Sequence, residues 1–211
     1  QRVRLGATPE GKLVSLQHDY VYPRSMLDDY HENCGEATSF HYSVPNLRVE
    51  FGRARRNIGT PSDMRGPGAV PGLYATESAM NELADQLKIV PVRLRVLNEP
   101  NIDEGKGILF SSRHYIECLE QGMEKFGWSK RNPEIGSMKR DGQTLGWGMA
   151  GAAWIAARFA AAANVELRDD GTARVACGTQ DIGTGTYTIL AQLTSQRTGV
   201  PLEKVEVALG D

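Results

Sequence analysis

Apolar and polar side chains alternate in short runs along the first fifty residues, a pattern typical of half-buried β-strands. Residues 2–5 and 11–22 predict two strands around the turn ThrProGluGly, and the second alternates clearly from Leu13 onward. Two shorter strands are expected at 40–42 and 47–51, separated by the turn ValProAsn. A small sheet is therefore expected in this part of the chain.

The middle of the chain has the spacing of amphipathic helices. Apolar residues recur every three or four positions in 75–88, where Thr76 is the expected N-cap. A second helix is expected at 111–126, capped by one of its first two residues, both of which are serine. The run 91–98 alternates Val and Leu with Arg, and it fits either a strand or the end of a helix.

The C-terminal third predicts small strands and one helix. Small and apolar residues at 145–157 and 159–168 predict two strands, and the turn AspAspGly connects the second to a hairpin partner. A strand–loop–helix–strand unit completes the chain: strand 172–177, loop 178–185, helix 186–198 and strand 201–209.

These elements predict an α+β protein of two lobes, each with small sheets and packed helices. The stretch 128–144 is polar and contains Pro133, Gly136 and Gly142, which indicates a linker between the lobes. We expect a first lobe at 1–135 and the start of a second lobe at 136–211.

Composition argues against several classes of function. The 24 Lys and Arg residues nearly balance 26 Asp and Glu, and the net charge of −2 indicates neither nucleic-acid nor membrane binding. Three cysteines without a C-x-x-C pair and four histidines without i, i+4 spacing predict no metal site held by this chain. Free thiols indicate a reducing compartment, so we expect a cytoplasmic location by default. A periplasmic location stays open, because the sequence begins without an initiator Met.

The glycine loop at 177–188, CysGlyThrGlnAspIleGlyThrGlyThrTyrThr, is the most chemically suggestive segment. It precedes a predicted helix, and helix N-termini favour anions such as phosphate because their first N–H groups are free. Gly183 and Gly185 let the backbone approach a ligand closely, whereas Asp181 would repel phosphate. No Lys follows the glycines, so the loop is not a P-loop.

Three other interpretations of this loop stay open. It half-matches the dinucleotide fingerprint, with Thr188 at the position of the third Gly. Asp211 would then be the ribose-binding acid of an NAD-type dehydrogenase fragment. Alternatively, residues 178–186 belong to a non-catalytic phosphate- or nucleotide-binding module, or they serve only as a turn.

A second suggestive segment is MetArgGlyProGlyAlaValProGly at 64–72, within a Gly- and Pro-rich stretch expected as a long loop. Pro67 fixes its own φ and biases Gly66 towards an extended conformation, so the loop is stiff. Such a loop can aim several backbone N–H groups at one point. With the helix that follows, it resembles the motif R-[GA]-P-G…E-x-x-M-[DN]-E-L-A of the large molybdenum subunit in the xanthine dehydrogenase/aldehyde oxidase family.

Two further stretches resemble the same family in the same order. ProValArgLeuArgValLeuAsn at 91–98, with the residues at 110–112 and 117–122, is similar to the segment after that helix. GlyThrGlnAspIleGlyThrGly at 178–185 resembles the cofactor loop G-T-x-D-x-G-Q-G, with Thr184 in place of Gln. The resemblance covers about residues 40–211.

The resemblance implies an oxidoreductase that hydroxylates aldehydes or N-heterocycles with a molybdenum–molybdopterin cofactor, in its cytosine dinucleotide form. It implies partners that carry FAD and [2Fe–2S] clusters, the remainder of the molybdenum subunit, and a small-molecule substrate. The backbone amide at Arg65 or Gly66 would hydrogen-bond a molybdenum oxygen. The contacts with the pterin and its phosphates would come from Gln180, Asp181, Gly183, Thr184, Gly185 and Thr186.

Departures from the family pattern refine these expectations. Purine-oxidising members carry an aromatic residue two places after the arginine, where this sequence has Pro67, which favours aldehydes or other heterocycles. Small residues at 148–153 would leave an open pocket. Glu77 and Glu82 fit the helix rather than the role of the family's glutamate base, which is expected outside residues 1–211. We therefore expect an internal fragment that is inactive by itself.

Overall fold

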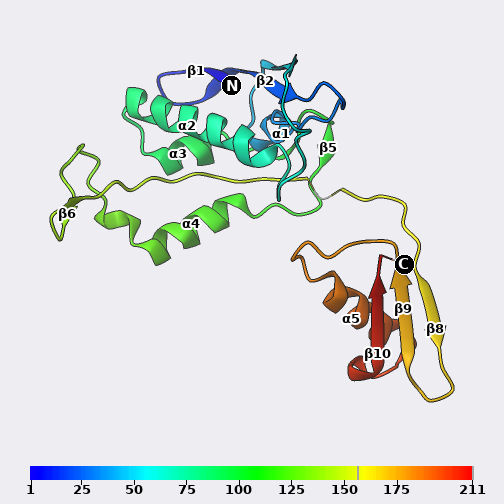
Figure 1. Cartoon of the computed structure of the whole chain (residues 1–211). Coiled ribbons are helices and arrows are strands. Elements are labelled where there is room, and N and C mark those ends of the chain that lie inside the picture. The colour runs from blue at the N-terminus through cyan, green and yellow to red at the C-terminus, as the bar shows by residue number, and fades with distance from the viewer. Residues whose placement is uncertain (156, 211) are drawn as a thin grey trace. The chain divides into compact units, whose positions relative to one another are not determined.

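The computed structural model describes residues 1–155 and 157–210, and the chain forms two compact units (Figure 1). The first unit is Gln1–Ile155 and the second begins at residue 156. Each has its own sheet and at least one helix, which confirms the α+β class. The first unit extends past residue 135 because the chain around residue 150 packs on one of its helices. The lobe boundary expected at 135/136 stays a prediction for the whole protein.

Three strands form the sheet of the first unit. β1 (Arg2–Ala7) and β2 (Leu13–Arg24) are antiparallel, and β3 (Leu47–Arg55) lies parallel to β2 on its other side. These strands confirm three of the four expected in this region. The strand expected at 40–42 was wrong, because the chain there forms the short helix α1 (Thr38–His41).

The longest helix, α2 (Ala69–Leu87), begins earlier than the periodicity indicated. Its Pro71 falls in the first turn, where a missing N–H costs no helical hydrogen bond. Thr76 therefore lies inside the helix, and its buried hydroxyl bonds the carbonyl of Gly72 at 3.2 Å instead of capping the N-terminus. The cap expected at Thr76 was wrong for this reason.

Two more helices follow in the first unit. The ambiguous run 91–98 is a helix, α3 (Pro91–Leu97), with proline at its first position. α4 (Tyr115–Phe126) confirms the next helix but begins after His114 without a side-chain cap, so the serine cap was wrong. The smaller elements are η1 (Trp128–Lys130) and two hairpins, β4 (Ile102–Asp103) with β5 (Ile108–Leu109), and β6 (Lys139–Arg140) with β7 (Gln143–Thr144).

A core of apolar side chains from β2, α2, α3, α4 and the segment 42–44 joins these elements. Burial of this surface is the main favourable contribution to folding. The buried members are Leu13, Leu16, Tyr42, Val44, Met80, Ala84, Leu94, Tyr115 and Leu119. Among the described residues, no helix is both long and apolar enough to cross a bilayer.

The second unit is a three-stranded sheet with one helix. β8 (Asn164–Leu167) and β9 (Ala173–Cys177) form the expected antiparallel hairpin. β9 leads through the glycine loop into α5 (Thr186–Thr198) and η2 (Leu202–Lys204), and β10 (Val205–Leu209) returns parallel to β9. The strand expected at 145–157 was wrong, since residues 145–155 pair with no other strand.

Candidate functional site

The loop before α2 presents backbone donors without partners. The carbonyl of Gly66 accepts hydrogen bonds from the amides of Ala69 at 3.1 Å and Val70 at 3.3 Å, which starts the helix. Among the described residues, the amides of Arg65, Gly66 and Gly68 donate no hydrogen bond. They lie at the positive end of a 19-residue helix, so an anion placed there would be stabilised.

The conformation of this loop corrects one expectation. Gly66 is left-handed, with φ of 76°, rather than extended as the following proline suggested. A Cβ at Gly72 would overlap the carbonyl oxygen of Cys34, and one at Gly68 would overlap that of Asn33. The start of α2 therefore packs directly on the backbone at residues 33–34, which only glycine permits. This close packing fixes the position of the loop with its free amides.

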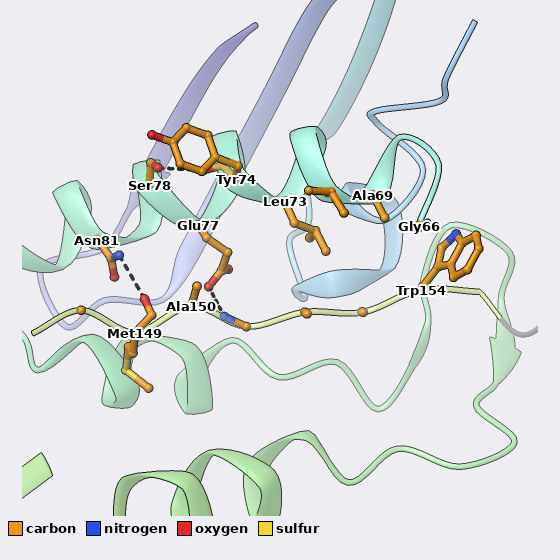
Figure 2. Close-up of a pocket in the computed structure, with 15 residues that line it drawn as sticks. Gly66, Ala69, Leu73, Tyr74, Glu77, Ser78, Asn81, Met149, Ala150 and Trp154 are labelled. Atoms are coloured by element: carbon orange, nitrogen blue, oxygen red, sulfur yellow. Dashed lines mark hydrogen bonds between the residues drawn. The ribbon is translucent and has the colours of Figure 1, made fainter. Parts of the chain in front are cut away.

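A cleft of about 800 Å³ lies between α2 and the extended segment 148–154, and it begins beside Gly66 (Figure 2). Its walls are mostly apolar, with Trp154 near the Gly66 end. The side chain of Arg65 is exposed and does not line it. The lining residues are Gly66, Ala69, Val70, Leu73, Tyr74, Glu77, Ser78, Asn81, Gly148, Met149, Ala150, Gly151, Ala152, Ala153 and Trp154.

A buried ionic network lies at the base of this cleft. Glu77 is 2% exposed and its Oε2 accepts hydrogen bonds from Arg95 Nε at 2.8 Å and the Gly151 amide at 2.5 Å. Its Oε1 accepts the hydroxyl of Tyr42, and the Nε2 atom of His41 lies 3.4 Å away without hydrogen-bond geometry. The carboxylate is thus contacted by residues from three other segments of the first unit.

The same contacts fix the charge of Glu77. Burial by itself raises the pKa of this carboxyl, but His41, the charge of Arg95 and the donated hydrogen bonds outweigh it. The resulting pKa is about 2. A carboxylate so acidic and so fully bonded is a poor general base, which agrees with its expected structural role in the helix. Its contact with Gly151 was not predicted, because no sequence signal links residues 74 positions apart.

In the second unit, the glycine loop is organised around one side chain. Oδ1 of Asp181 accepts hydrogen bonds from the amides of Gly183 at 2.8 Å, Thr184 at 3.0 Å and Gly185 at 3.3 Å. These backbone hydrogen bonds, that of Gly183 first, lower the pKa of Asp181. The carboxylate expected to contact the cofactor therefore occupies three of the loop's own donors.

Other groups of the loop remain available. The amide of Thr186 donates no hydrogen bond among the described residues, and no partner contacts the side-chain amide of Gln180. Gly183 and Gly185 have positive φ angles of 91° and 81°, with open space where a Cβ would stand. Asp211 lies outside the described residues. Within those residues, no group of three or more His, Cys, Asp or Glu side chains is placed to hold a metal ion.

Comparison with known proteins identifies the family. Two family models, both described as a molybdopterin cofactor-binding domain, match residues 1–99 and 121–211. The chain is 38% identical over 213 residues to the aldehyde oxidoreductase molybdenum-binding subunit PaoC of Escherichia coli (strain K12), covering 100% of this chain and 29% of that protein. It is 31% identical over 158 residues to the putative xanthine dehydrogenase molybdenum-binding subunit XdhA of the same strain, covering 72% of this chain and 21% of that protein.

Solved structures share the fold. Quinoline 2-oxidoreductase from Pseudomonas putida 86 matches with a TM-score of 0.72 at 20% identity, over 98% of this chain and 29% of that chain. The aldehyde oxidoreductase from Desulfovibrio desulfuricans ATCC 27774 also gives a TM-score of 0.72, at 19% identity, over 98% of this chain and 24% of that chain. The chain spans less than a third of these proteins. With its two cofactor-domain matches, it belongs to the molybdenum-binding subunits of the xanthine dehydrogenase/aldehyde oxidase family.

Proposed function

We propose that these residues are the molybdenum-cofactor-binding part of an oxidoreductase that hydroxylates aldehydes or N-heterocycles. The observation that carries the proposal is the set of unbonded amides at Arg65, Gly66 and Gly68 before α2, of which Gly66 lines the cleft. Free donors at a helix N-terminus suit an anionic cofactor. When bound, the molybdenum cofactor would supply the redox centre that accepts two electrons from the substrate carbon.

Each part of the chain would contribute differently to holding the cofactor. The amides of Arg65 and Gly66 would donate hydrogen bonds to cofactor oxygens from fixed positions. In the second unit, Gln180 and Thr186 keep free donors, whereas Asp181 would hold the loop in shape. The remaining contacts would come through the open surface at Gly183 and Gly185 and the hydroxyl of Thr184.

The finer assignments follow from the family. We propose the cytosine dinucleotide form of the cofactor, electron transfer to subunits or domains that carry [2Fe–2S] clusters and FAD, and association with the remainder of a molybdenum subunit. The relative PaoC is named as a molybdenum-binding subunit, which supports partners in a larger enzyme. A cytoplasmic location is supported by three free cysteines, of which Cys118 is exposed. An apolar cleft and Pro67 favour aldehydes over purines.

The proposal is tested on the complete open reading frame that encodes these residues, expressed in a host that synthesises the molybdenum cofactor. We expect about one molybdenum per protein, release of CMP on acid hydrolysis, and dye reduction with aldehydes in preference to xanthine. A protein that is folded but free of molybdenum would refute the assignment. Binding of NAD or free nucleotide in its place would favour the other interpretations of the glycine loop.

Two matched variants distinguish the contribution of the loop's backbone amides from that of the Arg65 side chain. Arg65→Ala keeps the amide and removes only an exposed side chain, so we expect activity within about twofold of the wild type. Gly66→Ala forces a Cβ onto a residue with φ of 76°, which strains the loop by about 1 kcal/mol or more and displaces its amides. We expect Gly66→Ala to lower kcat at least tenfold. Equal effects of the two variants would contradict a role for the amides.

A further inference from the structure

The wall of the cleft opposite α2 is held by side chains instead of by a sheet. Among the described residues, the segment 148–154 makes three hydrogen bonds. The Gly151 amide donates to Glu77 Oε2 at 2.5 Å, and the Met149 carbonyl accepts from Asn81 Nδ2 at 3.1 Å and from Arg95 Nη2 at 3.4 Å. Figure 2 shows the first two of these contacts reaching from α2 to the segment.

Beyond these hydrogen bonds, the segment is held by apolar contacts of Met149 and Ala153 with the cores of the first unit. Five of its seven residues are Gly or Ala, which have few side-chain contacts and, for Gly, a large freedom of φ and ψ. An unpaired chain of this kind loses about 1–2 kcal/mol per residue in conformational entropy when it is ordered. A strong hydrogen bond to a charged acceptor at its middle residue offsets part of that cost.

The acceptor is itself rigidly placed. Arg95 is 0% exposed and bonds Glu77 Oε2, the side-chain oxygen of Asn81 and the carbonyl of Pro91. Gly151 packs so closely on the ring of Tyr115 that any Cβ would overlap its hydroxyl oxygen. The charge on Glu77, the guanidinium of Arg95 and the bare backbone of Gly151 thus form one interlocked unit.

We propose that Glu77 is a positioning residue, whose buried carboxylate fixes the segment 148–154 and thereby sets the width of the cleft that begins at Gly66. The carboxylate acts on the reaction only through this wall. We call the hydrogen bond from the Gly151 amide to Glu77 the tether. The tether is a property of the fold alone, whereas its effect on the substrate rests on the proposed function. Loss of the tether would let the wall move away from α2 and widen the cleft.

The test compares two double variants in the complete protein, because a single replacement leaves Arg95 as an unpaired buried charge. Glu77→Met/Arg95→Met replaces the pair by apolar side chains of similar length and removes the acceptor for the Gly151 amide. Glu77→Gln/Arg95→Met is the matched control, since it keeps a carbonyl oxygen at the same place. Asn81→Ala removes the contact with Met149 and one acceptor of Arg95 but keeps both charges of the ion pair, which covers the case of a double variant that fails to fold.

Hydrogen exchange measured by mass spectrometry reads out the tether without any need for cofactor. We expect the Gly151 amide, followed in peptides covering 148–154, to exchange at least tenfold faster in Glu77→Met/Arg95→Met. Peptides from β2 should be unchanged, the glutamine control should recover most of the protection, and Asn81→Ala should show a smaller increase. Unchanged exchange of 148–154 in both the methionine double variant and Asn81→Ala would overturn the proposal.

Steady-state kinetics on the same proteins test whether the tether sets the width of the cleft for the substrate. A wider cleft should raise KM for an aldehyde at least fivefold with kcat changed less than twofold, at equal molybdenum content. A fall in kcat alone would overturn the assigned role in cleft width. Faster exchange in a protein that binds no molybdenum would support the tether while refuting the proposed function, so the two failures are distinguishable.

Discussion

The ion pair of Glu77 makes a specific contribution to acid stability. Its folded-state pKa of about 2 lies below the ordinary value of 4.5. A lowered carboxyl pKa means that the stabilisation is present above pH 4.5 and is lost as the pH falls towards 2. At about 1.4 kcal/mol per pKa unit, the group contributes about 3 kcal/mol at neutral pH.

Glu77→Gln removes this contribution at every pH and leaves Arg95 short of its counter-charge, so we expect a loss of about 3–5 kcal/mol at pH 7. The difference in unfolding free energy between wild type and variant should shrink by about 3 kcal/mol between pH 6 and pH 2. Urea unfolding followed by tryptophan fluorescence measures this, since Trp128, Trp147 and Trp154 all lie in the first unit.

Glu82→Gln is the control, because Glu82 is exposed on the same helix, and its unfolding free energy should follow the wild type within about 0.5 kcal/mol at each pH. If Glu77→Gln and the wild type lost stability in parallel across this range, the reasoning from the buried pair would be refuted.

Three further predictions follow from the packing and the loops. Gly72→Ala should lower the unfolding free energy by about 1–3 kcal/mol in thermal unfolding, because its Cβ would overlap the Cys34 carbonyl. Gly122→Ala on α4 is the control: its Cβ would meet open space, so it should be neutral or stabilising by up to about 1 kcal/mol. Asp181→Ala should lower the molybdenum content at least threefold, while Asp181→Asn keeps an acceptor for the loop amides and should not; equal content in both would contradict the role of Asp181 in holding the loop in shape. The 211 residues by themselves should give no aldehyde-dependent dye reduction, and clear turnover would disprove this.

Local patterns determined much of this fold. The helix expected at 186–198 coincides with α5, and the turn AspAspGly connects β8 and β9 as predicted. These elements depend on neighbours within a few positions, because helix ends, glycine loops and tight turns have local chemical causes. The ordered motifs around Arg65 and Asp181 were likewise sufficient to indicate the family, which the comparisons confirm.

Tertiary contacts decided the remainder. The segment 40–42 has strand-like residues, yet it lies at the end of α1 because Phe40 and His41 are buried there. The segment 145–155 looks like a strand but pairs with none, and side chains of α2 and α3 bond its backbone at Met149 and Gly151 instead. Nothing within a short window of sequence distinguishes Glu77 from Glu82. Only the folded chain gives one of them a buried arginine and a backbone amide 74 residues away, and so a fixed charge at the base of the cleft.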